Sequence, residues 1–310
     1  MIRAYPGRPS VRAGEPLTLH VSGDAPRFRI AIYRWEHALV PVWRGDWLRA
    51  EHLPDGRAAD FDLHAQPALL QDYRLLVSVG HDEYWSEATR DAVEDFVAGG
   101  GNLALFGANL CWWRIHLVDV GTVMVCHQGG KHGAQDHWWP ATGARRPEDS
   151  PSGASYRHGG GWWDGPRDTP GFVVQQPGHW IFAGTGLSHG ESLGGDTWPP
   201  LPGYECDGVP VDHIGPGGQA ILSAWRDEAG TPDGYQLLAA CPLDRRWQEL
   251  PPRERHGAGE GTHVAAMGMF RHGGTVFSAG TTDWAQVLGE ARDRRVERIT
   301  RNVLDRLSHA

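Results

Sequence analysis

The clearest pattern of apolar and polar positions runs from Leu75 to Phe106. Residues 75–79 are a short, nearly continuous apolar run, which is typical of a strand buried on both faces. Ser86 then stands where a helix N-cap belongs, and apolar residues recur at helical spacing up to a run of three glycines. Residues 103–106 form a second apolar run. Two buried strands joined by a helix predict a parallel crossover unit.

The loops that follow these two strands are polar and aromatic. Residues 80–85 read GHDEYW, and residues 107–113 read GANLCWW. Ligands of parallel sheets bind beyond the carboxyl ends of the strands. We therefore expect the two loops to lie side by side at a functional site.

The N-terminal part of the chain shows the alternation of half-buried strands. Residues 17–21 and 28–33 both alternate, with a turn sequence between them, which predicts a β-hairpin. We expect residues 1–50 to form a β segment packed on a main domain at 51–310.

The remaining chain carries three weaker patterns. Residues from about 111 to 215 show little periodicity and predict a loop-rich insertion over the carboxyl edge of the sheet, with short strands at 172–175 and 180–183. Residues 265–279 predict a hairpin, and an apolar stripe predicts a C-terminal helix capped by Asp283. We expect His137 to Trp139 and His158 to Trp163 to approach the 80–85 turn.

Together these elements predict an α/β fold. Its sheet should be mostly parallel and flanked by helices, with a short N-terminal β-hairpin and the long loop-rich insertion attached to it.

The charge and composition of the chain argue against several kinds of binding partner and cellular location. The 310 residues carry 29 basic and 38 acidic side chains, a net charge of −9, which argues against nucleic acid or an anionic membrane as the main partner. No apolar stretch approaches the roughly 20 residues of a membrane span. The N-terminus lacks a hydrophobic signal region, so we expect a cytoplasmic location. The four cysteines form no CxxC pair, which indicates neither a zinc ribbon nor a disulfide scaffold.

Four segments carry a resemblance to a known family. VSVGHDEYWS, GGGNLALFGAN, GYECDG and GTVFSAGTTDW resemble the large subunit of N,N-dimethylformamidase and its relatives, over roughly residues 60 to 310. The resemblance implies a glutamine-amidotransferase-like α/β fold and hydrolysis of small amides. It also implies a mononuclear iron held by two tyrosines and one glutamate.

The family motifs point to particular metal ligands in this chain. Tyr84 matches the tyrosine of GHDEYWS, and Glu205 in GYECDG is the best match for the glutamate, with Glu191 as the second choice. The segment around the family's upstream tyrosine is not recognisable here, which leaves Tyr33 as the candidate ligand at the end of a predicted strand. A histidine in its place is the open alternative. Tyr84 also precedes a helix N-terminus, whose field favours a phenolate.

The loop residues themselves suggest catalytic roles. His81 and Glu83 are candidates for moving protons, and Asn109 is a candidate donor to a developing oxyanion. The plainer interpretation is that these side chains only shape the turns.

The sequence can also be compared with a nucleophilic hydrolase and with a non-catalytic binding module. The chain has no G-x-S-x-G nucleophile elbow, and no cysteine or serine stands at the Gly80 turn, so nucleophilic hydrolase chemistry is not indicated. The alternative to a metal-dependent amide hydrolase is a non-catalytic binding module whose Trp-rich loops bind a sugar or a partner protein.

A small amide is the expected substrate, and a homo-oligomer is a further possibility because a Trp-rich surface suits an interface.

Overall fold

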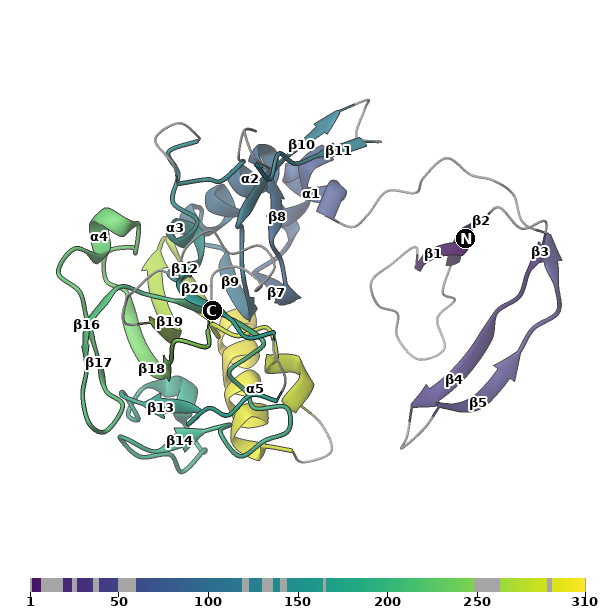
Figure 1. Cartoon of the computed structure of the whole chain (residues 1–310). Helices are drawn as coiled ribbons and strands as arrows, with labels where there is room; N and C mark the ends of the chain where they lie inside the picture. Colours follow the sequence, from purple (N-terminus) through teal and green to yellow (C-terminus); the bar gives the residue numbers. More distant parts are fainter. Residues whose placement is uncertain are drawn as a thin grey trace. The chain divides into compact units, whose positions relative to one another are not determined.

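Figure 1 shows the computed structural model of the chain, which describes residues 2–6, 19–23, 27–35, 39–49, 60–118, 123–129, 136–139, 144–163, 166–247, 263–288 and 292–309. The chain divides into two compact units. The first comprises Met1–Asp62 and Val118–Val123, and the second comprises Leu63–Leu117 and Met124–Ala310.

Strands in the first unit pair differently from the prediction. β1 (Ile2–Pro6) pairs antiparallel with β2 (Leu19–Gly23), and β4 (Ala31–Trp35) pairs antiparallel with β5 (Leu39–Arg44). Short β3 (Arg27–Phe28) pairs with β6 (Leu48–Arg49). The predicted hairpin between the 17–21 and 28–33 runs is therefore wrong, because each run finds its partner elsewhere along the chain. The packing of residues 1–50 on a main domain stays a prediction.

The second unit begins with the predicted crossover. After α1 (Asp60–Ala65) and the 3₁₀ turn η1 (Pro67–Asp72), β7 (Leu75–His81), α2 (Glu87–Ala98) and β9 (Asn102–Ala108) follow in order. β7 and β9 are parallel, from Leu75 opposite Asn102 to His81 opposite Ala108. Ser86 caps α2, since its hydroxyl accepts a hydrogen bond from the Thr89 amide. The crossover unit is confirmed.

The main sheet has seven strands in the order β14-β13-β18-β19-β20-β9-β7. Its other members are β13 (Phe172–Val174), β14 (Ser192–Leu193), β18 (Gln236–Leu243), β19 (His263–His272) and β20 (Gly274–Ser278). Parallel pairing joins β7 to β9 and β9 to β20, whereas the four remaining pairs are antiparallel.

The predicted fold class, an α/β fold with a mostly parallel, helix-flanked sheet, is therefore wrong. The chain is mainly strand, and its sheets are mixed or antiparallel. The physical reason is that β18 and β19 are buried over most of their length. A strand covered on both faces has the same continuous apolar run whether its neighbour is parallel or antiparallel.

The predicted insertion is partly built into this sheet. β13 confirms the strand expected at 172–175, whereas the strand expected at 180–183 is a 3₁₀ turn, η2 (Trp180–Phe182). Beside the main sheet lie three smaller ones. They comprise β8 (Tyr84–Ser86) with β10 (Trp113–Val118) and β11 (Val123–Val125), β12 (Ser155–Gly161) with β15 (Glu205–Gly208), and β16 (Val211–Ile214) with β17 (Ala220–Leu222). Short helices α3 (Asp149–Ser152) and α4 (Arg226–Ala229) lie in the connections.

The C-terminal elements follow the prediction in kind but not in their bounds. The hairpin of β19 and β20 is confirmed. The helix α5 spans Arg294–His309 and is preceded by a separate 3₁₀ turn, η3 (Trp284–Val287). Asp283 does not cap α5, because its carboxylate instead pairs with Arg167 and accepts a hydrogen bond from Gln286.

Two apolar cores lie on either side of β9. Ala104 and Phe106 belong to a core with the buried residues of α5, whereas Leu103 and Leu105 belong to a core with the buried residues of α2. This alternation follows from the period of two along a strand. Figure 1 shows α5 in yellow beside the sheet. Among the described helices, none is long and apolar enough to cross a membrane.

Candidate functional site

The site lies at the carboxyl end of β7 and β9. His81, the last residue of β7, donates a hydrogen bond from Nε2 to the Glu205 carboxylate, and Asn109 Nδ2 donates to the same Glu205 oxygen over 3.1 Å. His81 Nδ1 lies 3.5 Å from Glu83. Three other residues predicted to form the site, Glu83, Asn109 and Glu205, thus lie around the His81 imidazole.

Backbone contacts hold the two loops together. The Cys111 amide donates to the Asp82 carbonyl and the Trp113 amide donates to the Glu83 carbonyl, each over 2.8 Å. Side chains brace the turn as well, because the Asp82 carboxylate accepts hydrogen bonds from Ser78 and from the Trp85 indole. The loops following β7 and β9 are therefore side by side, as predicted.

Two glycines make this close approach possible. Gly80 has φ of +85°, in the region where a side chain is disfavoured. Gly107 on β9 packs so tightly against the Gly80 carbonyl that a Cβ there would clash with it. The GHDE turn therefore needs glycine on both strands.

β15 carries the other half of the site. Glu205 and Asp207 are two residues apart, so their side chains leave the same face of the strand. Glu205 contacts His81, whereas the buried Asp207 carboxylate accepts hydrogen bonds from the backbone amides of Asn109 (2.7 Å) and Leu110 (3.4 Å). Asp207 thereby holds Asn109, whose φ is +50°, in a left-handed conformation.

The segment 281–283 fixes β15 in turn. Thr282 accepts a hydrogen bond through its hydroxyl from the Glu205 amide and donates one from its own amide to the Glu205 carbonyl. The Asp207 amide donates to the Gly280 carbonyl. The GTTDW motif thus supports the strand that delivers the two carboxylates.

Charge and burial set the protonation of the site. The hydrogen bond to Glu205 raises the pKa of His81 above its usual value, although burial opposes this shift. Burial raises the pKa of Glu83 to about 6, with the nearby charge of Glu205 adding to the rise and that of His81 opposing it. A histidine with a raised pKa and a glutamate whose pKa is about 6 therefore lie side by side.

Tyr84 stands one residue beyond this pair. Its hydroxyl accepts a hydrogen bond from Gln128 over 3.2 Å. Burial, followed by the charge of Glu83, raises the pKa of the phenol. The surroundings of the ring therefore oppose the ionisation that the helix N-terminus was expected to favour.

Aromatic side chains of the Trp-rich region pack around Tyr84. Trp112, Trp113 and Tyr156 form a buried cluster, against which Tyr84, Trp139 and Trp163 pack. The predicted approach of residues 137–139 and 158–163 to the 80–85 turn is confirmed at this cluster. Because Trp112 and Trp113 are buried and Trp139 and Trp163 are partly buried, this cluster packs beside the 80–85 turn and does not form an exposed binding surface.

The donor chemistry at Glu205 fits a cation. The Glu205 carboxylate lies beside Asn109, whose Oδ1 is buried without a hydrogen-bond partner. Oxygen donors of this kind suit a hard metal ion. Tyr33 lies in β4 of the first unit with its side chain outside the described residues, so its role as the third ligand stays a prediction. Glu191 is exposed and accepts from the Ser188 amide.

Sequence reasoning missed two residues of the site. Asp207 was not singled out, although its place two residues after Glu205 on a strand was the available signal. Tyr204 stacks on His81, with ring centroids 6.1 Å apart. No local sequence pattern predicts the contact between Tyr204 and His81, because the two residues are distant in the sequence.

Cysteine chemistry finds no support in the described residues. Cys111, Cys206 and Cys241 are fully buried, and burial raises the pKa of each thiol. A buried thiol with a raised pKa is a poor nucleophile. The rejection of a nucleophilic cysteine from the sequence agrees with this.

Comparison with known proteins identifies the family of the chain. The family model described as N,N-dimethylformamidase beta subunit-like, C-terminal, matches residues 8–297, and the chain belongs to this family. The chain is 25% identical over 278 residues to the N,N-dimethylformamidase beta subunit of Paracoccus aminophilus, covering 84% of the chain. It is 24% identical over 279 residues to that of an Alcaligenes species, also covering 84% of the chain. The chain spans 35% of the length of each relative. The resemblance inferred from the motifs is confirmed.

Proposed function

We propose that this chain carries the catalytic part of a hydrolase that cleaves the C–N bond of a small amide. The observation that carries the proposal is the convergence of His81, Glu83, Asn109 and Glu205 on one point at the end of two parallel strands. Membership of a family named for an amidase supports the same class of reaction.

The protonation states suit hydrolysis. With a pKa of about 6, Glu83 is largely ionised at neutral pH and acts as a general base that takes a proton from the attacking water. The hydrogen bond to Glu205 raises the pKa of His81 and favours its protonated form, which donates the proton to the departing amine. An acid and a base whose pKa values are set by different surroundings are what amide cleavage requires.

Asn109 supplies the third function. Its left-handed backbone and the Asp207 carboxylate fix where its side chain points. Its Nδ2 donates to Glu205 and is positioned to donate to the oxygen of a bound carbonyl as negative charge develops. A donor fixed before the reaction begins stabilises the transition state without reorganisation.

The metal ligands are part of the same proposal. Glu205 and Tyr84 would hold an iron ion, with Tyr33, or a histidine in its place, completing the ligand set. Such an ion would polarise the amide carbonyl and lower the pKa of water. Because the surroundings of Tyr84 raise its pKa, its ionisation would depend on the ion itself.

N,N-dimethylformamide is the first substrate to test, because both relatives are named for it. The purified chain should release an amine and a carboxylic acid from a panel of small amides. Glu83→Gln and Asn109→Ala should each reduce the turnover number at least about a hundredfold. Glu191→Gln, at an exposed glutamate on another loop, is the matched control and should leave turnover unchanged. Equal turnover in the parent and Glu83→Gln would overturn the assignment.

The binding-module alternative finds only part of its expected surface. Trp112, Trp113, Trp138 and Trp162 of the Trp-rich region are buried and are not available to stack on a sugar, whereas Trp198 of the same region is exposed.

A further inference from the structure

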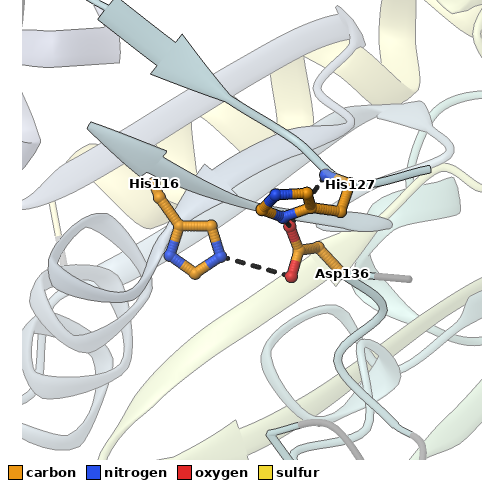
Figure 2. A group of neighbouring side chains, drawn as sticks. All are labelled: His116, His127 and Asp136. Atoms are coloured by element: carbon orange, nitrogen blue, oxygen red, sulfur yellow. Dashed lines mark hydrogen bonds and ion pairs between the residues drawn. The ribbon is translucent and has the colours of Figure 1, made fainter. Parts of the chain in front are cut away.

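A second group of metal-type side chains lies apart from the Glu205 carboxylate. His116 on β10, His127 just after β11, and Asp136 come from three segments and meet in space, as Figure 2 shows. One ligand atom from each lies within 4.8 Å of the others. None of these residues was singled out from the sequence, because no spacing rule links them.

Asp136 stands between the two imidazoles. His116 Nε2 lies 3.2 Å from one carboxylate oxygen, and His127 Nδ1 lies 2.8 Å from the other. Donor atoms bound to one zinc ion are about 3.3 Å apart in a tetrahedral site with bonds of roughly 2 Å. The 3.2 Å separation at His116 is close to that value and the 2.8 Å separation at His127 is shorter, so side-chain rotation opens the space that an ion needs.

The backbone holds the cluster in place. The Arg114 amide donates to the Asp136 carbonyl, and the Asp136 amide donates to the His127 carbonyl, each over 2.7 Å. The His127 amide donates in turn to the Asp136 carboxylate over 2.8 Å. Because Asp136 is tied to both histidine-bearing segments, the three side chains are positioned before any ligand binds.

Solvent reaches the cluster. The side chains of His116 and His127 are 38% and 55% exposed, whereas that of Asp136 is 15% exposed. An ion can therefore enter from water and keep water in its remaining coordination positions. Two imidazoles and one carboxylate form a donor set that suits divalent zinc, iron, nickel or copper better than calcium or magnesium.

We infer that His116, His127 and Asp136 form a second metal site, which takes a divalent first-row transition ion such as zinc. The site has a structural consequence. The residue after His127 is Gln128, whose amide donates to the Tyr84 hydroxyl. An ion at the cluster therefore ties the 126–128 segment to β10 and fixes the hydrogen-bond donor to Tyr84.

Cobalt is the probe for the test, since bound Co²⁺ absorbs visible light and replaces zinc in such sites. The full chain, stripped of metal with a chelator, is titrated with Co²⁺ and then with competing Zn²⁺. In the Glu205→Gln background, which lacks the carboxylate of the proposed iron site, we expect one equivalent of Co²⁺ to bind with a visible band and to be displaced by Zn²⁺. His116→Asn and Asp136→Asn should each weaken binding at least about tenfold. His189→Asn, at an exposed histidine elsewhere, is the matched control and should bind as the parent does.

A Glu205→Gln variant separates this site from the proposed amidase site. Its equivalent of Co²⁺ should still bind and should be lost when His116→Asn is added. Circular dichroism of every variant checks that the fold is kept, and zinc should raise the melting temperature of the parent but not of His116→Asn. In the Glu205→Gln background, binding that survives His116→Asn, or a folded chain that takes up no ion, would show that the three side chains form a hydrogen-bonded network only.

Discussion

At the scale of single residues, Glu83 sets how the proposed activity depends on pH. Its pKa of about 6 lies above the ordinary value because of burial. A general base works when ionised, so activity should rise as pH increases through about 6. It should fall again at higher pH as His81, whose pKa is raised, loses its proton. A profile of kcat/KM against pH in the parent tests this bell shape.

The raised pKa of Glu83 affects stability in the opposite direction from activity, because it favours the folded chain at acidic pH. A folded-state pKa above the unfolded value means that the folded chain binds the proton more tightly. The contribution of Glu83 to the free energy of unfolding is therefore full at acidic pH and is lost as pH rises through about 6. Glu83→Gln should abolish both the acidic limb of the activity profile and this part of the stability change. An acidic limb that persists in Glu83→Gln would assign it to another group.

Tyr84 gives the sharpest test of iron. Phenolate bound to ferric iron absorbs visible light through charge transfer, so the isolated protein should be coloured if Tyr84 is a ligand. Tyr84→Phe keeps the ring in its aromatic cluster and removes only the oxygen. The variant should stay folded, lose the colour and lose iron, as measured by absorption and metal analysis. A colourless parent without bound transition metal would contradict the iron proposal.

At the scale of elements, β15 is the strand on which the site depends. Asp207→Ala leaves the buried amides of Asn109 and Leu110 without acceptors, which should cost about 1–3 kcal/mol of unfolding free energy. Asp207→Asn keeps one acceptor oxygen and should cost less. Urea unfolding measures both, and equal losses in the two variants would count against the acceptor role of Asp207.

The helix α2 offers a test of the crossover unit. Ala92 is buried in the core that contains Leu103 and Leu105, so Ala92→Asp places a charge there without a partner. We expect a loss of about 3 kcal/mol or more. Ala98→Asp, the same substitution at an exposed position of the same helix, should cost under about 1 kcal/mol. Similar melting curves for the two variants would contradict the burial of this face.

At the scale of the whole molecule, the three apolar clusters of the described residues are drawn from Leu63 onward. A chain that starts at Asp60 should therefore unfold in one cooperative transition, with a melting temperature close to that of the full chain. If Tyr33 is a metal ligand, this shorter chain should bind less iron while keeping its fold. Loss of cooperativity would instead show that the main unit needs residues 1–59 for its fold.

The sequence by itself determined those helices, strands and turns whose formation depends on residues close together in the chain. The β7–α2–β9 unit, the Ser86 cap and the β19–β20 hairpin followed from periods of two and 3.6 and from turn residues. The meeting of the loops after β7 and β9 followed as well, because parallel neighbours end at one edge. His81, Glu83 and Asn109 could therefore be placed together from the sequence, and the motifs gave the family.

Only the tertiary structure decided which distant segments pair. It made most of the sheet antiparallel, set β15 where Glu205 reaches His81, and brought His116, His127 and Asp136 together. The physical reason is that strand direction and partner are fixed by long-range hydrogen bonding and side-chain packing. Long-range pairing produces no periodic pattern in the sequence, because a strand buried on both faces is apolar whether its neighbour is parallel or antiparallel.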